Sequence, residues 1–218
     1  MFLDKDNTEL LTADEMAAQT PASTAGPYEA WKHFPHSYIS HHGAACCETA
    51  REWFLAMDYA TLGGESTLTG PRWIRARYNW GPSAHPIHWC EAVKRKTLDC
   101  GALAALAHEC FLERGLRSFP VQLVQRYSTD AAAHWESRWA GDEVSTHWIN
   151  DDVIYHEGCA VLLPGGDLQI WDASAAWWIN PLQTTGYGSL AALRIWTGDA
   201  ASLRWGKHRI PTDKWTVL

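Results

Sequence analysis

The stretch IYHEGCAVLLPGGDLQIWDAS, residues 154–174, decides the fold of the second half of the chain. A turn signal, PGGD at 164–167, separates two apolar-rich runs. Proline and glycine in such a place are typical of a tight turn between antiparallel strands, so the stretch predicts a β-hairpin. His156 and Asp172 stand eight residues before and after Pro164. The hairpin is therefore expected to bring these two side chains roughly opposite each other.

Helical patterns dominate the chain before the hairpin. Residues 96–115 form the clearest pattern, because apolar residues recur at helical spacing and alanine is abundant. Shorter helices are expected over residues 8–19, 46–64, 71–80, 131–141 and 188–196. Residues 119–127 alternate apolar and polar side chains, as a half-buried strand does. Helices followed by antiparallel strands predict an α+β fold.

Composition excludes several classes of function. The 218 residues carry a formal net charge of -7, and the longest basic run is Lys94-Arg95-Lys96, which argues against a nucleic-acid partner. No apolar run reaches the length of about 18 residues that a membrane span needs. The N-terminus lacks the basic-then-apolar order of a signal peptide. We therefore expect a cytoplasmic protein without a membrane partner, and its oligomeric state stays open.

Cys100 is the candidate nucleophile among six cysteines, which are expected to be free thiols in a reducing compartment. It lies in the first turn of the helix expected over 96–115, directly after Asp99. A helix N-terminus favours an anion and lowers a cysteine pKa, whereas the charge of Asp99 opposes this effect. Gly101 lets a substrate or another backbone approach closely. The alternative interpretation is a small cysteine buried in the core.

His156 and Asp172 supply the remaining parts of an acyl-transfer site. A carboxylate beside an imidazole fixes the tautomer and leaves the other ring nitrogen to accept a proton. A thiol at a helix N-terminus then completes the set needed for nucleophilic acyl transfer. Taken singly, a strand histidine such as His156 is more often structural, and Asp172 is compatible with the start of a turn.

The pattern resembles the transglutaminase-like fold, a branch of the papain-like cysteine enzymes. DCGALAALAHECFLERGLRSFPVQLVQRY, from Asp99, is similar to the family's cysteine helix and the strand after it. HEGCAVLLPGGDLQIWD, from His156, is similar to the family's histidine hairpin. RWIRARYNW, residues 72–80, resembles the segment before the cysteine in bacterial members. The resemblance covers residues 71–176.

This resemblance implies that Cys100 is the nucleophile, His156 the general base and acid, and Asp172 the orienting carboxylate. It also implies residues 66–218 as the catalytic core, with 1–65 as an N-terminal helical extension packed on it in one compact domain. The implied enzyme is a cysteine hydrolase or acyltransferase that works through a thioester. Its substrate is a small-molecule or peptidic acyl donor, and no cofactor is expected.

The sequence departs from the family at four positions. The aromatic residue expected two places after the histidine is Gly158, and the usual glutamate is Ala160. Cys159 replaces another typical strand residue, and Leu98 replaces a glycine. We interpret Gly158 as room beside the base, which puts a protein glutamine substrate in doubt.

An oxyanion hole is expected from the backbone N–H of Cys100, because amides at a helix N-terminus point outward. Family members often add a tryptophan side chain from before the cysteine. Trp73, Trp80 and Trp89 lie in that region, and Trp80 is preferred; each is also compatible with a place in the core.

Alternatives remain open. Residues 33–47 contain several possible zinc ligands, namely His33, His36, His41, His42, Cys46 and Cys47. Adjacent His-His and Cys-Cys pairs suit tetrahedral zinc poorly, so no metal is expected, although a metal-dependent hydrolase is a rival hypothesis. No acidic cluster has calcium-loop spacing. His147 is a rival base, and a binding module that keeps the fold without catalysis is the remaining alternative.

Overall fold

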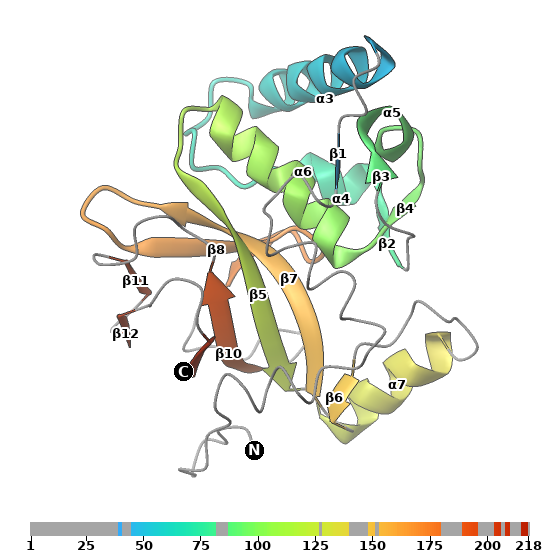
Figure 1. Ribbon diagram of the computed structural model, residues 1–218, viewed down its shortest axis with the longest axis vertical. Coiled ribbons are helices and arrows are strands. Elements are labelled where there is room, and N and C mark those ends of the chain that lie inside the picture. Colours follow the sequence, from blue (N-terminus) through green and yellow to red (C-terminus); the bar gives the residue numbers. More distant parts are fainter. Residues whose placement is uncertain are drawn as a thin grey trace.

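A computed structural model describes residues 39–40, 45–81, 87–126, 128–139, 148–150, 153–179, 189–195, 203–205, 208–209 and 215–217. The helices are α3 (Ala45–Leu62), α4 (Arg72–Arg77), α5 (Trp89–Ala92), α6 (Cys100–Glu113) and α7 (Thr129–Trp139). The architecture is α+β, with helices α3 to α6 grouped on one side of an antiparallel sheet and α7 apart from them, beside strand β6, Trp148–Asn150 (Figure 1).

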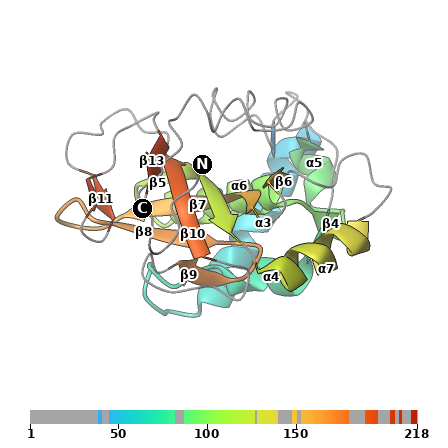
Figure 2. The same cartoon turned by 90° about the horizontal axis from the view of Figure 1, so that it is seen from below.

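The strands of the main sheet are β5 (Ser118–Arg126), β6 (Trp148–Asn150), β7 (Val153–Leu162), β8 (Leu168–Asp172), β9 (Trp177–Ile179), β10 (Ser189–Ile195) and β13 (Trp215–Val217). Their order is β13-β10-β5-β7-β8-β9, and β6 pairs with β7 (Figure 2). Every pairing in this sheet is antiparallel. The short pairs are β1 (Ile39–Ser40) with β3 (Ile87–His88), β2 (Asn79–Trp80) with β4 (Thr97–Leu98), and β11 (Arg204–Trp205) with β12 (His208–Arg209).

The predicted hairpin is confirmed as β7 and β8. Their register runs from Cys159 opposite Trp171 to Leu162 opposite Leu168. The turn is closed by a backbone hydrogen bond of 2.7 Å from the N–H of Leu163 to the carbonyl of Asp167. Gly165 and Gly166 have φ of 101° and 90°, which a residue with a side chain adopts only with strain, so the PGGD sequence is what allows this turn.

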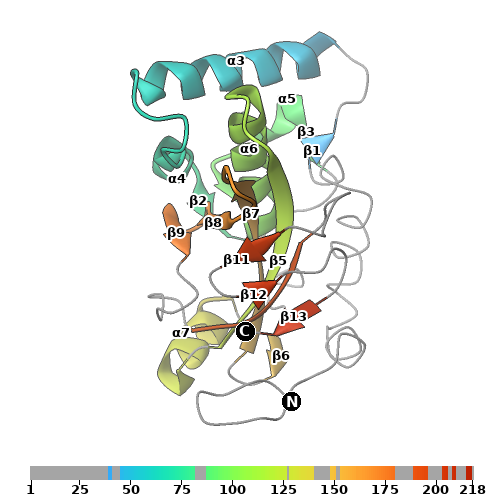
Figure 3. The same cartoon turned by 90° about the vertical axis from the view of Figure 1, so that its left-hand side faces the viewer.

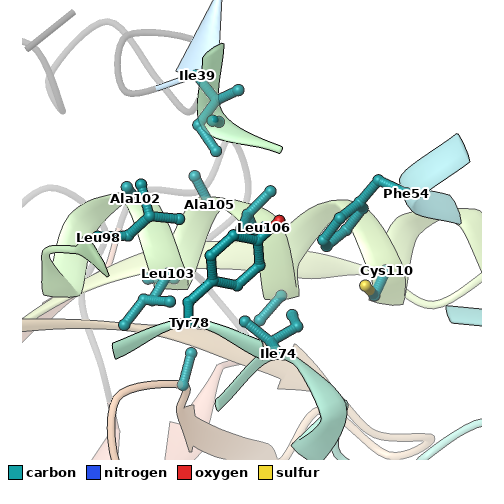
Figure 4. Packing of buried hydrophobic residues seen from close by; sticks show 14 of the residues in the cluster. Ile39, Phe54, Ile74, Tyr78, Leu98, Ala102, Leu103, Ala105, Leu106 and Cys110 are labelled. Carbon is teal, nitrogen blue, oxygen red and sulfur yellow. The ribbon is translucent and has the colours of Figure 1, made fainter. Parts of the chain in front are cut away.

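The helices and the sheet form layers. Helix α6 packs on β7 and β5, and α3 lies on the side of α6 away from the sheet (Figure 3). The alanine-rich sequence of α6 makes this possible, because residues 101–111 are all buried. Residues from α3, α4 and β4 surround the helix in one apolar cluster, which includes Phe54, Tyr78 and Leu106 (Figure 4). The cluster thus surrounds the helix that begins at Cys100.

Other predicted elements have mixed outcomes. The helices over 46–64, 96–115 and 131–141 and the strand over 119–127 are confirmed as α3, α6, α7 and β5. The helix predicted over 71–80 is shorter, since α4 ends at Arg77 and β2 follows. The helix predicted over 188–196 is wrong, because that segment pairs with β5 as strand β10. The predicted helix over 8–19 lies outside the described residues.

A buried ion pair joins helix α3 to the C-terminal end of helix α6. Both carboxylate oxygens of Asp58 on α3 accept from Arg114, at 2.6 and 2.8 Å. The indole N–H of Trp73 donates to the same carboxylate at 2.8 Å. The side chains of Asp58 and Arg114 are only 3% and 5% exposed, so this pair is the most deeply buried charge contact of the helical layer that we describe.

Among the residues that the structure describes, no helix is both long enough and apolar enough to cross a membrane.

Candidate active site

Cys100 is the first residue of α6, as the sequence predicts. Asp99 caps the helix, and its carboxylate accepts from the N–H of Ala102 at 2.9 Å. The N–H of Leu103 bonds the carbonyl of Asp99 at 3.0 Å. The amides of Cys100 and Gly101 are the other two of the first helical turn, whose N–H groups have no acceptor within the helix. The helix start therefore offers backbone donors at the thiol.

Trp80 is brought to the same place by the short parallel pair β2–β4. Trp80 stands opposite Leu98, two residues before Cys100. The N–H of Gly81 bonds the carbonyl of Leu98 at 3.1 Å, which holds β2 alongside the approach to α6. The ring centroids of Trp80 and His156 are 6.4 Å apart, in a T-shaped arrangement. Of the three tryptophans weighed from the sequence, Trp80 is the one that contacts a predicted site residue.

Trp73 and Trp89 have structural roles instead. Trp73 donates to Asp58, and Trp89 is fully buried and stacks in a tilted arrangement on Phe54 with 5.5 Å between ring centroids. Both pack in the apolar cluster around α6.

His156 and Asp172 are in contact. His156 Nε2 lies 3.0 Å from Asp172 Oδ1, and the two side chains are 6% and 2% exposed. The N–H does not point along the line to the oxygen, so the pair is a close polar contact rather than a well-aligned hydrogen bond. Catalytic hydrogen bonds often align only when substrate is present, so this geometry remains compatible with a base and its orienting carboxylate. Nδ1 is the nitrogen that does not face Asp172.

The contact is diagonal rather than directly across the hairpin. Pairing between β7 and β8 ends with Cys159 opposite Trp171, so Asp172 comes level with Gly158, two residues from His156. Asp172 is fixed from its other side, because Oδ1 accepts from the N–H of Ser174 at 2.9 Å. The carboxylate is thus held by the turn that follows β8.

Gly158 makes the close approach of the two strands possible. A Cβ at this position would lie 2.8 Å from the carbonyl oxygen of Trp171, nearer than real Cβ atoms come. The sequence interpretation, room beside the base, is therefore incomplete. The space is taken by the backbone that carries Asp172.

The thiol of Cys100 lies beside the backbone of β7. The N–H of Glu157 donates toward the sulfur. The carboxylate of Asp172 is near enough for its charge to raise the pKa of the Cys100 thiol. The described contacts connect Cys100 with Glu157 and His156 with Asp172; a direct contact between thiol and imidazole is not among them.

The side chain of His156 belongs to the sheet face turned away from α6. Leu123 is its direct partner on β5 and packs with Ala160 and Ile170 in a second apolar cluster. Opposite residues on paired strands share a face, so His156 lies on that face as well. Trp80, however, packs against the first cluster and still meets the His156 ring. His156 pairs with β5 but stands beyond the last described pair of β7 with β8, Cys159 with Trp171, so Trp80 meets the ring where β8 has stopped pairing.

The pKa of Cys100 is raised, whereas the sequence predicted that the helix N-terminus would lower it. Burial of the thiol is the main cause, followed by the charges of Glu157 and Asp99. Asp99 acts in the predicted direction, but burial and Glu157 were not visible in the sequence. The resting thiol is thus neutral at neutral pH, and a base must remove its proton during attack.

Glu157 is the residue near the site that the sequence reasoning missed. It is buried, it follows His156 directly, and its charge acts on Cys100. The available signal was a charged residue inside an otherwise apolar strand. The rival base His147 and the histidines His33, His36, His41 and His42 lie outside the described residues.

Comparison of the chain with protein-family models, with curated proteins and with solved structures gave no match.

Replacing Gly158 with alanine is expected to weaken both stability and the site. The new methyl group meets the Trp171 carbonyl, so the free energy of unfolding should fall by about 1–3 kcal/mol. The same displacement moves Asp172 away from His156. Urea unfolding measures the first effect, and the NMR chemical shift of the His156 ring measures the second. Gly165→Ala in the hairpin turn is a control that strains the backbone without touching this contact. An unchanged ring resonance in Gly158→Ala would contradict this assignment of Gly158.

Stability is expected to fall in alkaline solution. Burial is the main cause that raises the pKa of the Cys100, Cys110 and Cys159 thiols in the folded chain. The fold thus favours the protonated thiols, so their contribution is fully present below the unfolded pKa of about 8.5 and is lost as the pH rises above it. Each thiol should lower the free energy of unfolding by about 1.4 kcal/mol per pH unit above that value. Urea titrations at several pH values measure how steeply the free energy of unfolding falls with pH, and Cys110→Ala should reduce this slope by the contribution of one thiol. A Cys110→Ala slope identical to that of the original chain would contradict a contribution from the buried Cys110 thiol.

Proposed function

We propose that the chain is a cysteine-dependent acyl-transfer enzyme with a transglutaminase-like fold. The observation that supports this most is the buried His156–Asp172 contact of 3.0 Å, with the Cys100 thiol at the start of α6 near enough to Asp172 for the carboxylate charge to act on it. Nucleophile, base and carboxylate come in the order and spacing that the sequence resemblance implies. The α+β architecture, with the cysteine helix packed on an antiparallel sheet, agrees with that fold.

The proposed first step is attack by Cys100 on an amide or ester carbonyl. Asp172 holds the His156 ring through Nε2, and Nδ1 accepts the thiol proton as the sulfur–carbon bond forms. A neutral resting thiol requires this coupling, because little thiolate is present beforehand. This step requires Nδ1 to come within hydrogen-bond reach of the sulfur while Nε2 stays at Asp172.

The tetrahedral oxyanion is stabilised by the backbone N–H of Cys100, with the indole N–H of Trp80 as a second donor. Protonated His156 gives its proton to the leaving amine or alcohol, and the bond to the leaving group breaks. Water or an amine then attacks the thioester, releases the acid or the new amide, and returns the thiol. Glu157 disfavours a permanent thiolate and so keeps the cysteine inert until a substrate carbonyl is in place.

The acyl donor is proposed to be a small or peptidic, partly apolar molecule, since an indole lines the approach to the base. The reaction is assigned to the cytoplasm. The six cysteines, all of which lie in the described part of the chain, form no disulfide there, which agrees with a reducing compartment.

Interception by hydroxylamine tests the proposal. The chain is incubated with a panel of peptide amides and small acyl esters, with and without hydroxylamine. A thioester intermediate reacts with this amine and yields an acyl hydroxamate, whereas direct hydrolysis by an activated water does not. We expect hydroxamate to form with the original chain and to be lost in Cys100→Ala. Equal hydroxamate yields from both proteins would exclude the cysteine mechanism.

A non-catalytic binding module is the second candidate. The observation that favours it is the neutral thiol together with the absence of a thiol–imidazole contact among those described. It differs from the first candidate in one measurable respect, because a binding module would give no hydroxamate with any acyl donor that it retains.

A further inference from the structure

Three cysteines outside the candidate active site come together from two segments. Cys46 and Cys47 lie in the first turn of α3, and Cys90 lies in α5. Their sulfur atoms are all within 4.8 Å of one another. Cys47 is buried, Cys90 is half-buried and Cys46 is exposed. The cluster is therefore fixed on its inner side and open to solvent at Cys46.

Contacts on both sides of the cluster hold the two helices that carry the cysteines. The parallel pair β1–β3 places Ile39 opposite Ile87 and Ser40 opposite His88, just before the two helices begin. Helix α3 then packs against α5, and Phe54 meets Trp89 deeper along the same contact. These contacts set the relative position of the two helices. The three thiols are therefore brought together by the packing of α3 on α5 and not by bonds among the thiols themselves.

The thiols already interact. The side chain of Cys90 is hydrogen-bonded to those of Cys46 and Cys47. Thiolates brought this close together repel one another. A cation bound between the sulfurs removes that repulsion and deprotonates them. The amides at the start of α3 add a favourable field for the anions of Cys46 and Cys47.

We propose that Cys46, Cys47 and Cys90 form a binding site for a thiophilic divalent cation, Zn²⁺. Zinc–sulfur bonds of about 2.3 Å in a tetrahedron separate the sulfurs by about 3.8 Å, a small adjustment from the observed cluster. Each thiol that binds releases its proton to solvent. Water takes the fourth position on the exposed side of Cys46.

A zinc ion bound here links the start of α3 to α5, and the site takes no part in the proposed acyl transfer. No metal was expected from the sequence, because adjacent cysteines such as Cys46 and Cys47 suit tetrahedral zinc poorly. In the fold, however, their sulfurs converge with that of Cys90, 43 residues after Cys47, within 4.8 Å. The pairing of β1 with β3 supplies the third ligand, and this pairing has no signal in the local pattern. Bound zinc should therefore act on the stability of the helical layer rather than on the chemistry at Cys100.

Zinc titration of the reduced full chain tests the site. We expect about one zinc ion per chain, with thiolate-to-metal charge-transfer absorption when Co²⁺ is used as the probe. Cys46→Ser and Cys90→Ser should each weaken zinc binding by about 100-fold or more, because a thiolate ligand is lost. Both positions retain solvent exposure, and far-UV circular dichroism verifies that the variants fold. Cys100→Ser is the matched control and should bind zinc as the original chain does.

Zinc should also raise the Tm of the original chain but not that of Cys90→Ser, and should protect these three cysteines from alkylation. Unchanged zinc affinity in Cys46→Ser and Cys90→Ser would overturn the site, since the ligands would then be elsewhere. Absence of stoichiometric binding by the reduced original chain, or conversion of the cluster to a disulfide in the presence of zinc, would overturn it as well. Loss of hydroxamate formation by Cys100→Ser with zinc retained would separate the two proposals.

Discussion

Replacing Cys100 with alanine is expected to lower kcat/KM for any acyl donor by about a thousandfold or more, because the nucleophile is removed while the fold is kept. Cys100 stands at the start of α6, where the residue as a whole is half-buried although its thiol is buried, and alanine removes only the sulfur. Steady-state kinetics with an acyl donor found in the hydroxylamine panel measure the loss.

The matched control is Cys110→Ala on the same helix. Cys110 is fully buried and lies near Asp58 at the far end of α6, so this variant should lose stability but keep its catalytic rate at low temperature. A Cys100→Ala protein that retains a tenth or so of the original rate would exclude attack by this thiol.

The three site residues should also act as a unit. His156→Ala should be about as inactive as Cys100→Ala, and the double variant should be no worse than either. Asp172→Asn keeps the shape but removes the charge that orients the ring, so a loss of about 100-fold to 10,000-fold is expected. If the loss of activity in the double variant equalled the product of the two single losses, Cys100 and His156 would instead act independently.

Replacing Asp58 with alanine is expected to lower the free energy of unfolding by about 3–5 kcal/mol. The change leaves the guanidinium of Arg114 buried without its carboxylate, and it leaves the Trp73 indole without its acceptor. The cost is large because a charge that is 5% exposed cannot be resolvated without opening the contact between α3 and α6. Urea unfolding monitored by the fluorescence of the tryptophans measures it.

Two control variants isolate the cause. Glu91→Ala breaks the surface pair with Arg95, whose side chains are 48% and 30% exposed, and should cost about 0–1 kcal/mol. Asp58→Leu combined with Arg114→Met replaces the buried pair by apolar groups and should be less destabilised than Asp58→Ala alone. If Asp58→Ala and Glu91→Ala were equally mild, burial of the ion pair would not be what joins α3 to α6.

The parts of the fold that the sequence predicted correctly are those specified by local chemistry. The PGGD turn with its alternating flanks predicts β7 and β8, and the apolar spacing with an Asp99 cap predicts α6. Segment 188–196 shows the opposite case. Its composition suits a helix, but its pairing with β5 makes it a strand, and the paired residues lie 63 to 74 positions apart in the sequence.

The candidate site divides in the same way. The contact of His156 with Asp172 follows from the hairpin and was predictable, since the turn alone brings the two strands together. The diagonal geometry depends on where the pairing stops, and the raised pKa of Cys100 depends on burial and on Glu157. Both arise from packing between segments, so neither is encoded in a local motif. The meeting of Cys90 with Cys46 and Cys47 has the same origin.

The most direct test of the account is the site of acylation. The chain is mixed with an activated acyl ester, quenched in acid, digested and mapped by mass spectrometry, with His156→Ala treated in parallel. The account predicts an acyl group on Cys100 in the original chain and none on Cys100 in His156→Ala. An acyl group on another cysteine, or equal acylation of Cys100 in the two proteins, would contradict it.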